Sequence, residues 1–83
     1  MKKHTKIYMD YFGYGEQDFI PCELCGGKAV DIHHIHGRGK GMDRIENLMA
    51  LCRECHTMAH NGDYRRMVLQ LKHYKILQQC DTD

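Results

Sequence analysis

The sequence predicts a small α+β domain, built from two short strands and a few helices around a core too thin to be stable unaided. Its 83 residues contain no Trp and only 8% aromatic residues. A chain of this length buries only about 60–65% of the surface that its unfolded form exposes. Domains of this size often draw extra stability from disulfides or a structural metal, and five Cys and seven His are present. We expect residues 1–83 to form one domain.

The composition excludes several classes of protein. No apolar run approaches the about 18 residues that a membrane span needs, and no apolar stretch follows Lys2 and Lys3 as it would in a signal peptide. We therefore expect a cytoplasmic protein without membrane contact, in which disulfides are disfavoured and clustered Cys indicate metal ligands. The net charge of +1 is low for a dedicated DNA-binding domain.

The N-terminal segment, residues 1–21, holds most of the aromatic side chains. Ile7, Tyr8, Tyr11 and Phe12 have helical spacing, and two glycines then end the pattern. The segment is either a lid packed over a metal site or a set of rings on which nucleic-acid bases stack. The sequence favours the lid.

The middle of the chain alternates turns with short strands. β-branched residues favour a first strand, and a stretch with three Gly and three basic residues must be a loop. Asn47 leads into a second, apolar strand. In order, the expected segments are a turn at 22–27, a strand at 28–35, a loop at 36–44, a segment at 45–51 that leads through Asn47 into a short strand, and a turn with a short helix at 52–60.

The longest predicted helix covers residues 64–79, with Asp63 as its N-cap, so that the C-terminal element spans 63–79. Its apolar residues form two offset stripes. A helix apolar on two sides has two surfaces to cover, and we expect one of them to form a homodimer. The first stripe is Tyr64, Met67, Val68, Leu71 and Tyr74, and the second is Leu69, Ile76 and Leu77. We expect Met49, Met58 and Met67 to fill the core, and His73 to face solvent.

Two Cys-x-x-Cys pairs form the strongest motif of the sequence. Cys22 and Cys25, then Cys52 and Cys55, offer four thiolates in the arrangement that suits structural Zn²⁺. The gap between the pairs is longer than in common zinc fingers, so something is inserted between them. A disulfide pair or a redox Cys-x-x-Cys is the less favoured interpretation in a cytosolic chain. Cys80 lies outside the pattern, and we expect it to be a free thiol.

Histidines gather within and just after this insert. His56 and His60 are spaced i, i+4, which puts both imidazoles on one face of a helix, a common arrangement for two ligands of one metal. We expect His4 to be solvated and without a partner. The remaining polar residues of this constellation are His33, His34, His36 and Asn47.

The stretch DIHHIHGRGKGMDRIENLMALCRECHTMAH, residues 31–60, together with CELC before it, resembles the HNH endonuclease family of ββα-metal nucleases. It looks like the small four-cysteine members found in phages and prophages. The pattern of His-His, Asn and His-x-x-x-His is also similar to the nuclease domains of colicins. The resemblance covers residues 22–60 and implies a zinc-stapled ββα-metal fold, with an N-terminal helical segment and a longer C-terminal helix outside it.

The resemblance also implies an activity, a metal-dependent DNA endonuclease that leaves a 5′-phosphate and a 3′-hydroxyl. His34 corresponds to the general base, and the same comparison selects it over His36. Asn47 corresponds to the residue that holds the hairpin and orients the base. Asp31 corresponds to an acidic position beside a ligating His. The implied ligands of the catalytic divalent cation (Mg²⁺, Mn²⁺, Ni²⁺ or Zn²⁺) are His33, His56 and His60.

DNA is the expected partner. Arg38, Lys40 and Arg44 lie in the loop over the expected site, where they can contact phosphates on either side of a cut. Because the resemblance is to phage and prophage proteins, we also expect a packaging or recombination protein as a partner and the cytoplasm of a bacterial host as the location. The alternative is a zinc-ribbon module that binds nucleic acid without cutting it. A metal-storage or redox protein is supported only by the Cys count.

Overall fold

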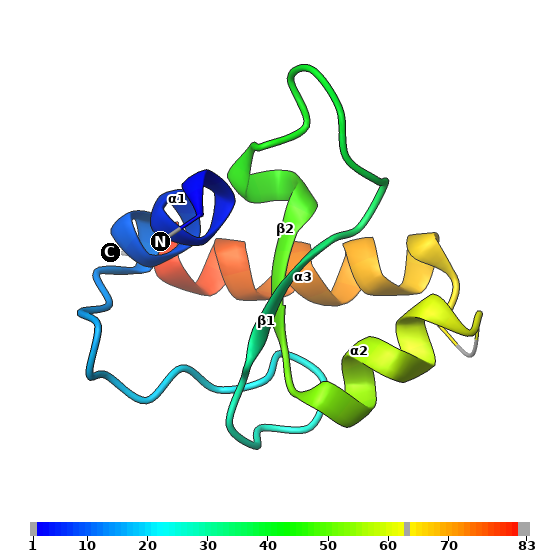
Figure 1. Cartoon of the computed structure of the whole chain (residues 1–83), viewed down its shortest axis with the longest axis horizontal. Coiled ribbons are helices and arrows are strands. Elements are labelled where there is room, and N and C mark those ends of the chain that lie inside the picture. Colours follow the sequence, from blue (N-terminus) through cyan, green and yellow to red (C-terminus); the bar gives the residue numbers. More distant parts are fainter. Residues whose placement is uncertain (1, 63, 82–83) are drawn as a thin grey trace.

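A two-stranded antiparallel hairpin lies at the centre of the protein, with helices on both of its sides (Figure 1). The computed structural model describes residues 2–62 and 64–81, the last two through their backbone alone. The expected cap Asp63 and the thiol of Cys80 lie outside this description. The predicted α+β class, with a helical N-terminal segment and a longer C-terminal helix, is confirmed.

The hairpin pairs β1 (Asp31–His34) with β2 (Leu48–Leu51), so that His34 lies opposite Leu48 and Asp31 opposite Leu51. All four residues of β2 are fully buried because both of its faces are covered. Met49 and Leu51 pack with Leu69 of the C-terminal helix, and Leu48 packs with Tyr8 of the N-terminal helix. Side chains alternate along a strand, so neighbouring residues of β1 face different helices.

Helix α1 (Lys3–Phe12) forms over the predicted aromatic pattern and buries Tyr8 and Met9. It ends at Gly13, whose φ of 75° is a left-handed conformation that favours glycine. The helix contacts β1, β2 and the short 3₁₀ turn η1 (Ile45–Asn47). The N-terminal segment therefore covers one face of the hairpin.

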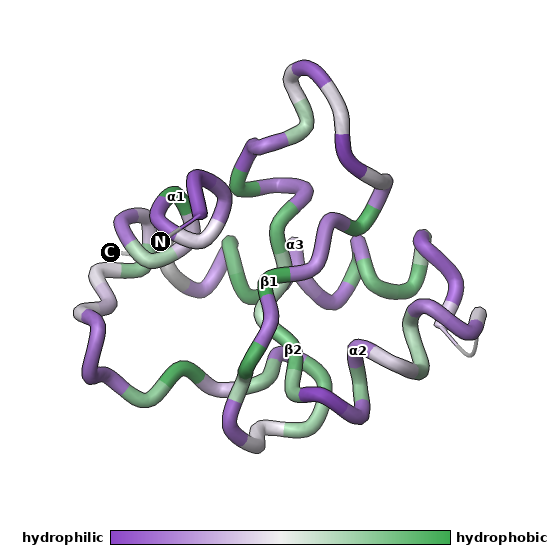
Figure 2. The backbone as a smooth tube through the Cα atoms, in the orientation of Figure 1, coloured by the Kyte–Doolittle hydropathy of each residue, from purple (hydrophilic) through white to green (hydrophobic). Residues whose placement is uncertain are grey.

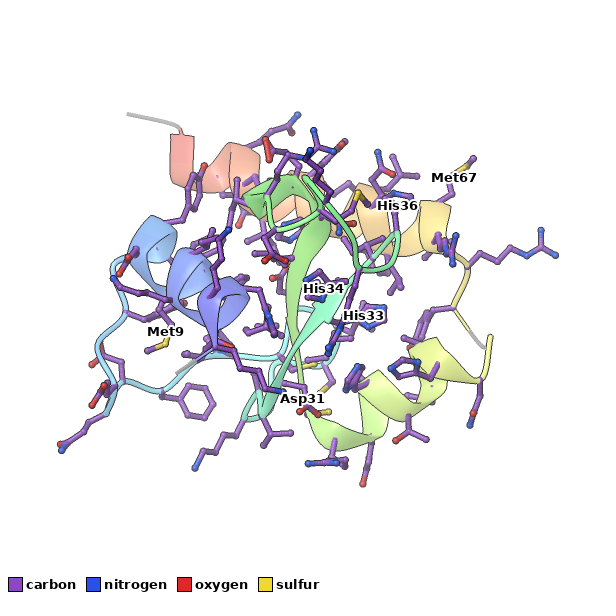
Figure 3. All side chains as sticks on the ribbon, turned by 45° about the horizontal axis from the view of Figure 1, so that its top comes forward. Met9, Asp31, His33, His34, His36 and Met67 are labelled. Atoms are coloured by element: carbon purple, nitrogen blue, oxygen red, sulfur yellow. The ribbon has the colours of Figure 1, made fainter. Side chains whose placement is uncertain are left out.

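Helix α2 (Arg53–His60) follows the second Cys pair, and helix α3 (Arg66–Asp81) crosses behind the hairpin (Figure 1). The apolar stripes of α3 differ from the prediction. The second stripe faces the core through Leu69 and Leu77, whereas Met67 of the first stripe is 73% exposed and Leu71 is exposed as well. The expectation that Met67 fills the core is therefore wrong, and Figure 3 shows it projecting from the start of α3.

His73 completes the buried side of α3, although the sequence suggested that it faces solvent. It is fully buried, with Nδ1 2.6 Å from Oε1 of Glu23 and Nε2 2.6 Å from the carbonyl oxygen of Ile45. Oε2 of Glu23 accepts hydrogen bonds from the hydroxyl of Tyr8 at 2.5 Å and from the backbone N–H of Ala50 at 3.1 Å. This polar network joins both flanking helices to the hairpin and to the first Cys pair.

The loop between β1 and η1 stands away from the hairpin, and its backbone carries mainly hydrophilic and near-neutral residues (Figure 2). Within the described part of the chain, none of the helices has the length and apolar character needed to cross a membrane.

Candidate active site

Four cysteines meet where the two Cys-x-x-Cys turns approach each other. One ligand atom from each of Cys22, Cys25, Cys52 and Cys55 can be chosen so that all lie within 4.8 Å of one another. The Sγ atoms of Cys25 and Cys52 are 3.7 Å apart. Two sulfurs on a tetrahedral Zn²⁺ with bonds of about 2.3 Å would be about 3.8 Å apart. The donor set and its spacing therefore fit a structural zinc ion.

Backbone N–H groups of the two turns donate hydrogen bonds to these sulfurs. The N–H of Gly27 donates to Sγ of Cys25, and the N–H of Cys55 donates to Sγ of Cys52, both at 3.4 Å. Burial, and then hydrogen bonding with the neighbouring thiols, raises the pKa of Cys55. Four thiols this close oppose one another's ionisation, so a bound cation would be needed to hold all four as thiolates.

A second cluster joins β1 to α2. His33, His56 and His60 place ring nitrogens within 4.8 Å of one another. The Nε2 atoms of His56 and His60 are 3.0 Å apart, close to the about 3.3 Å between two nitrogens on a tetrahedral Zn²⁺. The i, i+4 spacing produces this pair, and the second Cys turn fixes the start of the helix that carries it, because Sγ of Cys52 caps α2. The three imidazoles fit a divalent cation.

Asp31 contacts this cluster from the start of β1. Its Oδ2 lies 2.9 Å from Nδ1 of His56. A carboxylate only accepts, so Nδ1 of His56 carries a proton, and the other ring nitrogen, Nε2, lies 3.0 Å from Nε2 of His60. Burial, and then the nearby His56 and His60, lowers the pKa of His33 to about 4. His33 is therefore neutral at pH 7, as a metal-binding imidazole must be.

His34 points to the other face of the hairpin and is only 7% exposed. Its Nε2 lies 2.7 Å from Oδ1 of Asp43, and this hydrogen bond is the main cause that lowers the pKa of Asp43. Ionised Asp43 accepts, so Nε2 of His34 carries a proton in this contact. Sequence reasoning missed Asp43, although it is the only acidic residue between His36 and Arg44.

His4 is half-buried against His34, so the expectation that it is solvated without a partner is wrong. The two rings meet edge to face with their centroids 4.6 Å apart. Burial, and then the neighbouring His34, lowers the pKa of His4. No local sequence signal announces this contact, because α1 reaches β1 only through the tertiary fold.

Asn47 closes the loop that runs from β1 to η1. Its buried amide donates to the carbonyl oxygens of Gly37 at 3.2 Å and Met42 at 2.9 Å, and its Oδ1 accepts from the backbone N–H of His36 at 2.7 Å. One side chain therefore ties both ends of the loop to the hairpin.

His33 and His34 lie side by side at the end of β1, whereas His36 lies farther along, beside the start of α3 (Figure 3). Nε2 of His36 is paired with Oε1 of Gln70 on α3. The strand ends at His34 and turns at once, and this allows neighbouring residues to share one site.

One pocket of about 280 Å³ unites these groups. It is lined by Ile32, His33, His34, Gly37, Arg38, His56 and His60. Arg66, at the start of α3, lines an adjoining pocket with the same strand end and with His60. Lys40 and Arg44 are exposed on the loop.

The structure combines four cysteines that could hold a metal ion, three histidines that could hold a second, and a hairpin followed by a helix, and this combination is typical of metal-binding nuclease domains. Residues 22–62 match the family described as HNH endonuclease. No curated protein and no solved structure matches the chain. Residues 22–62 therefore belong to the HNH endonuclease family, and the clustered cysteines are consistent with its zinc-binding type. Membership implies nuclease-type activity on nucleic acid with divalent metal.

Proposed function

We propose that the protein is a metal-dependent DNA endonuclease that leaves a 5′-phosphate and a 3′-hydroxyl. The observation that carries this proposal is the environment of His34. Its Nε2 is committed to Asp43 at 2.7 Å, while its ring lines the same pocket as His33, His56 and His60. A base with one free ring nitrogen beside a metal-binding cluster is what hydrolysis of a phosphodiester requires.

In the proposed reaction, Nδ1 of His34 takes a proton from a water molecule. The water oxygen forms a bond to phosphorus, and the bond between phosphorus and the 3′ oxygen breaks. The leaving oxygen then takes a proton from solvent. A divalent cation held by His33, His56 and His60 would neutralise a phosphate oxygen and stabilise the leaving oxygen.

Two further side chains hold this arrangement. Asp31 keeps His56 in the tautomer that presents Nε2 to the cluster. Asn47 fixes the loop that carries Asp43, and so acts on His34 through the loop backbone. We assign both as positioning residues.

The proposed DNA contacts are made to phosphates. Arg38 lines the pocket, and the exposed Lys40 and Arg44 extend from the same loop. Arg66 adds a cation on the α3 side of the histidines. These contacts carry no base information, so we expect cleavage to be weakly selective for sequence. A structural Zn²⁺ at the cysteines would stabilise the fold, and we propose that residues 1–83 form one domain. The protein would act in the cytoplasm of a bacterial host, with a phage packaging or recombination protein as its partner.

Plasmid cleavage tests the proposal. Purified protein is incubated with supercoiled plasmid and Mg²⁺, Mn²⁺ or Ni²⁺, with zinc retained at the cysteines. His34→Ala should lose about 10²–10⁴-fold in rate, the usual worth of a general base. His36→Ala is the matched control, because His36 pairs with Gln70, and it should cut nearly normally.

Two outcomes would contradict the proposal. Wild-type protein that binds DNA without cutting it under all three metals would indicate the zinc-ribbon alternative. An inactive His36→Ala variant beside an active His34→Ala variant would mean that the base is assigned to the wrong histidine.

A further inference from the structure

A third group of metal-ligating side chains lies outside the cysteine and histidine clusters. His4 of α1, His34 of β1 and Asp43 of the loop offer ligand atoms that all lie within 4.8 Å of one another. We propose that these three residues form an inhibitory Zn²⁺ site, in which the bound ion blocks His34. The inhibitory part of this inference rests on the proposed nuclease function, whereas the metal site itself does not.

The donor set has the chemistry of a zinc site with an open position. Two imidazoles and one carboxylate are a common set of three protein ligands, with water as the fourth. Mg²⁺ prefers oxygen ligands and keeps much of its water, so a site with two ring nitrogens should select Zn²⁺ over Mg²⁺. The Asp43 carboxylate also offsets part of the charge of the ion.

The geometry needs only a small adjustment. Nε2 of His34 and Oδ1 of Asp43 are now 2.7 Å apart, and two such ligands on tetrahedral Zn²⁺ would be separated by about 3.3 Å. Asp43 lies in a loop between Gly41 and Arg44, with its side chain 32% exposed. The carboxylate can therefore withdraw by the required few tenths of an ångström, and the ion can enter from solvent.

The site is distinct from the histidine cluster because its other two ligands come from α1 and the loop, although His33 and His34 line the same pocket. His33 lies opposite Met49, which packs with the core under α3, and its ring contacts those of His56 and His60. His34 instead contacts His4 of α1. An ion held by His34 therefore leaves the three ligands of the other cluster free.

Zinc bound at this site would prevent His34 from accepting a proton, because it would fix which ring nitrogen carries hydrogen. An imidazole that binds metal through Nε2 keeps its one remaining proton on Nδ1. Nδ1 could then no longer accept a proton from water, although the catalytic cluster would still be intact.

Zinc binding is measured first, without reference to cleavage. In a His56→Ala/His60→Ala variant, which lacks the catalytic cluster, calorimetric titration should find one Zn²⁺ beyond the ion held by the cysteines. Adding His4→Phe keeps a ring against His34 but removes both donor nitrogens. Its affinity for that extra ion should fall by about 100-fold, since losing even a neighbour of a ligand costs about 10–100-fold. Circular dichroism verifies that each variant is folded.

Inhibition is then measured on the intact cluster. Zinc added to the Ni²⁺-activated enzyme should reduce plasmid cleavage. His4→Phe, compared with its own rate without added zinc, should require about 100-fold more zinc for the same fractional loss. An extra ion that binds equally well with Phe at position 4, or inhibition unchanged by that substitution, would overturn the inference. A wild-type protein that never cuts DNA would remove the proposed function, while the titration would still decide whether the third site exists.

Discussion

Replacing the buried His73 by leucine should remove a large part of the folding stability of this protein. Nδ1 of His73 faces a carboxylate oxygen of Glu23 and Nε2 faces the carbonyl of Ile45, both at 2.6 Å. Carboxylates and carbonyls only accept hydrogen bonds, so both ring nitrogens donate and the ring is an imidazolium. The Glu23 side chain is 3% exposed. Leucine would leave that carboxylate buried without its cation.

The expected loss in free energy of unfolding is about 3–5 kcal/mol, the usual cost of removing one member of a buried ion pair. A domain of this length has about 4–12 kcal/mol in total, at about 0.05–0.15 kcal/mol per residue. The hydrogen bonds from Tyr8 and Ala50 to Glu23 remain in the variant, which keeps the loss from exceeding this range.

The pair also predicts how stability depends on pH. Burial alone would lower the pKa of His73, but the hydrogen bond and charge of Glu23 outweigh it and raise the pKa above its ordinary 6.5. A raised pKa means that the stabilisation is complete below about pH 6.5 and is lost as pH rises through the folded-state value. Wild-type stability should therefore fall toward alkaline pH, and the fall should be smaller in His73→Leu.

Urea denaturation with saturating Zn²⁺ measures both effects. Lys72→Leu is the matched control, because it removes an exposed cation from the same helix and should change stability by no more than about 0.5 kcal/mol. A loss below about 1 kcal/mol in His73→Leu, or a wild-type stability that does not change above neutral pH, would refute a buried imidazolium.

Three further predictions concern metal, DNA and self-association. Cys22→Ser should lose the zinc ion and unfold the chain, because structural zinc contributes on the order of 10 kcal/mol; a folded, zinc-free variant seen by circular dichroism and metal analysis would contradict this. Arg38→Gln, Lys40→Gln and Arg44→Gln should each reduce, by about one unit, the slope of log DNA affinity against log salt concentration. An unchanged slope would exclude the loop as the DNA contact. The protein should form a homodimer through the outer face of α3, where Leu71 is 58% exposed, at tens of micromolar protein, a range of weak association. Sedimentation should show a monomer for Leu71→Glu, and a wild-type monomer would refute the dimer.

The sequence by itself determined the features that depend on local spacing. Two residues between paired cysteines set the turns, and three residues between His56 and His60 put both rings on one side of α2, because these geometries are fixed within a few residues. The family followed from the same stretch, since the order of its Cys, His and Asn residues is specific. The choice of His34 over His36 came from that resemblance, because strand periodicity alone puts both on one face.

Only the tertiary structure decided which distant side chains meet. His4 and Asp43 meet at His34 because α1 and the loop pack against the same end of β1. His73 meets Glu23, fifty residues away, because α3 crosses behind the hairpin. Which apolar stripe of α3 faces the core was likewise open, since helical periodicity gives two stripes without saying which one a partner covers. Contacts between elements depend on how those elements pack, and a single sequence carries no local signal for that.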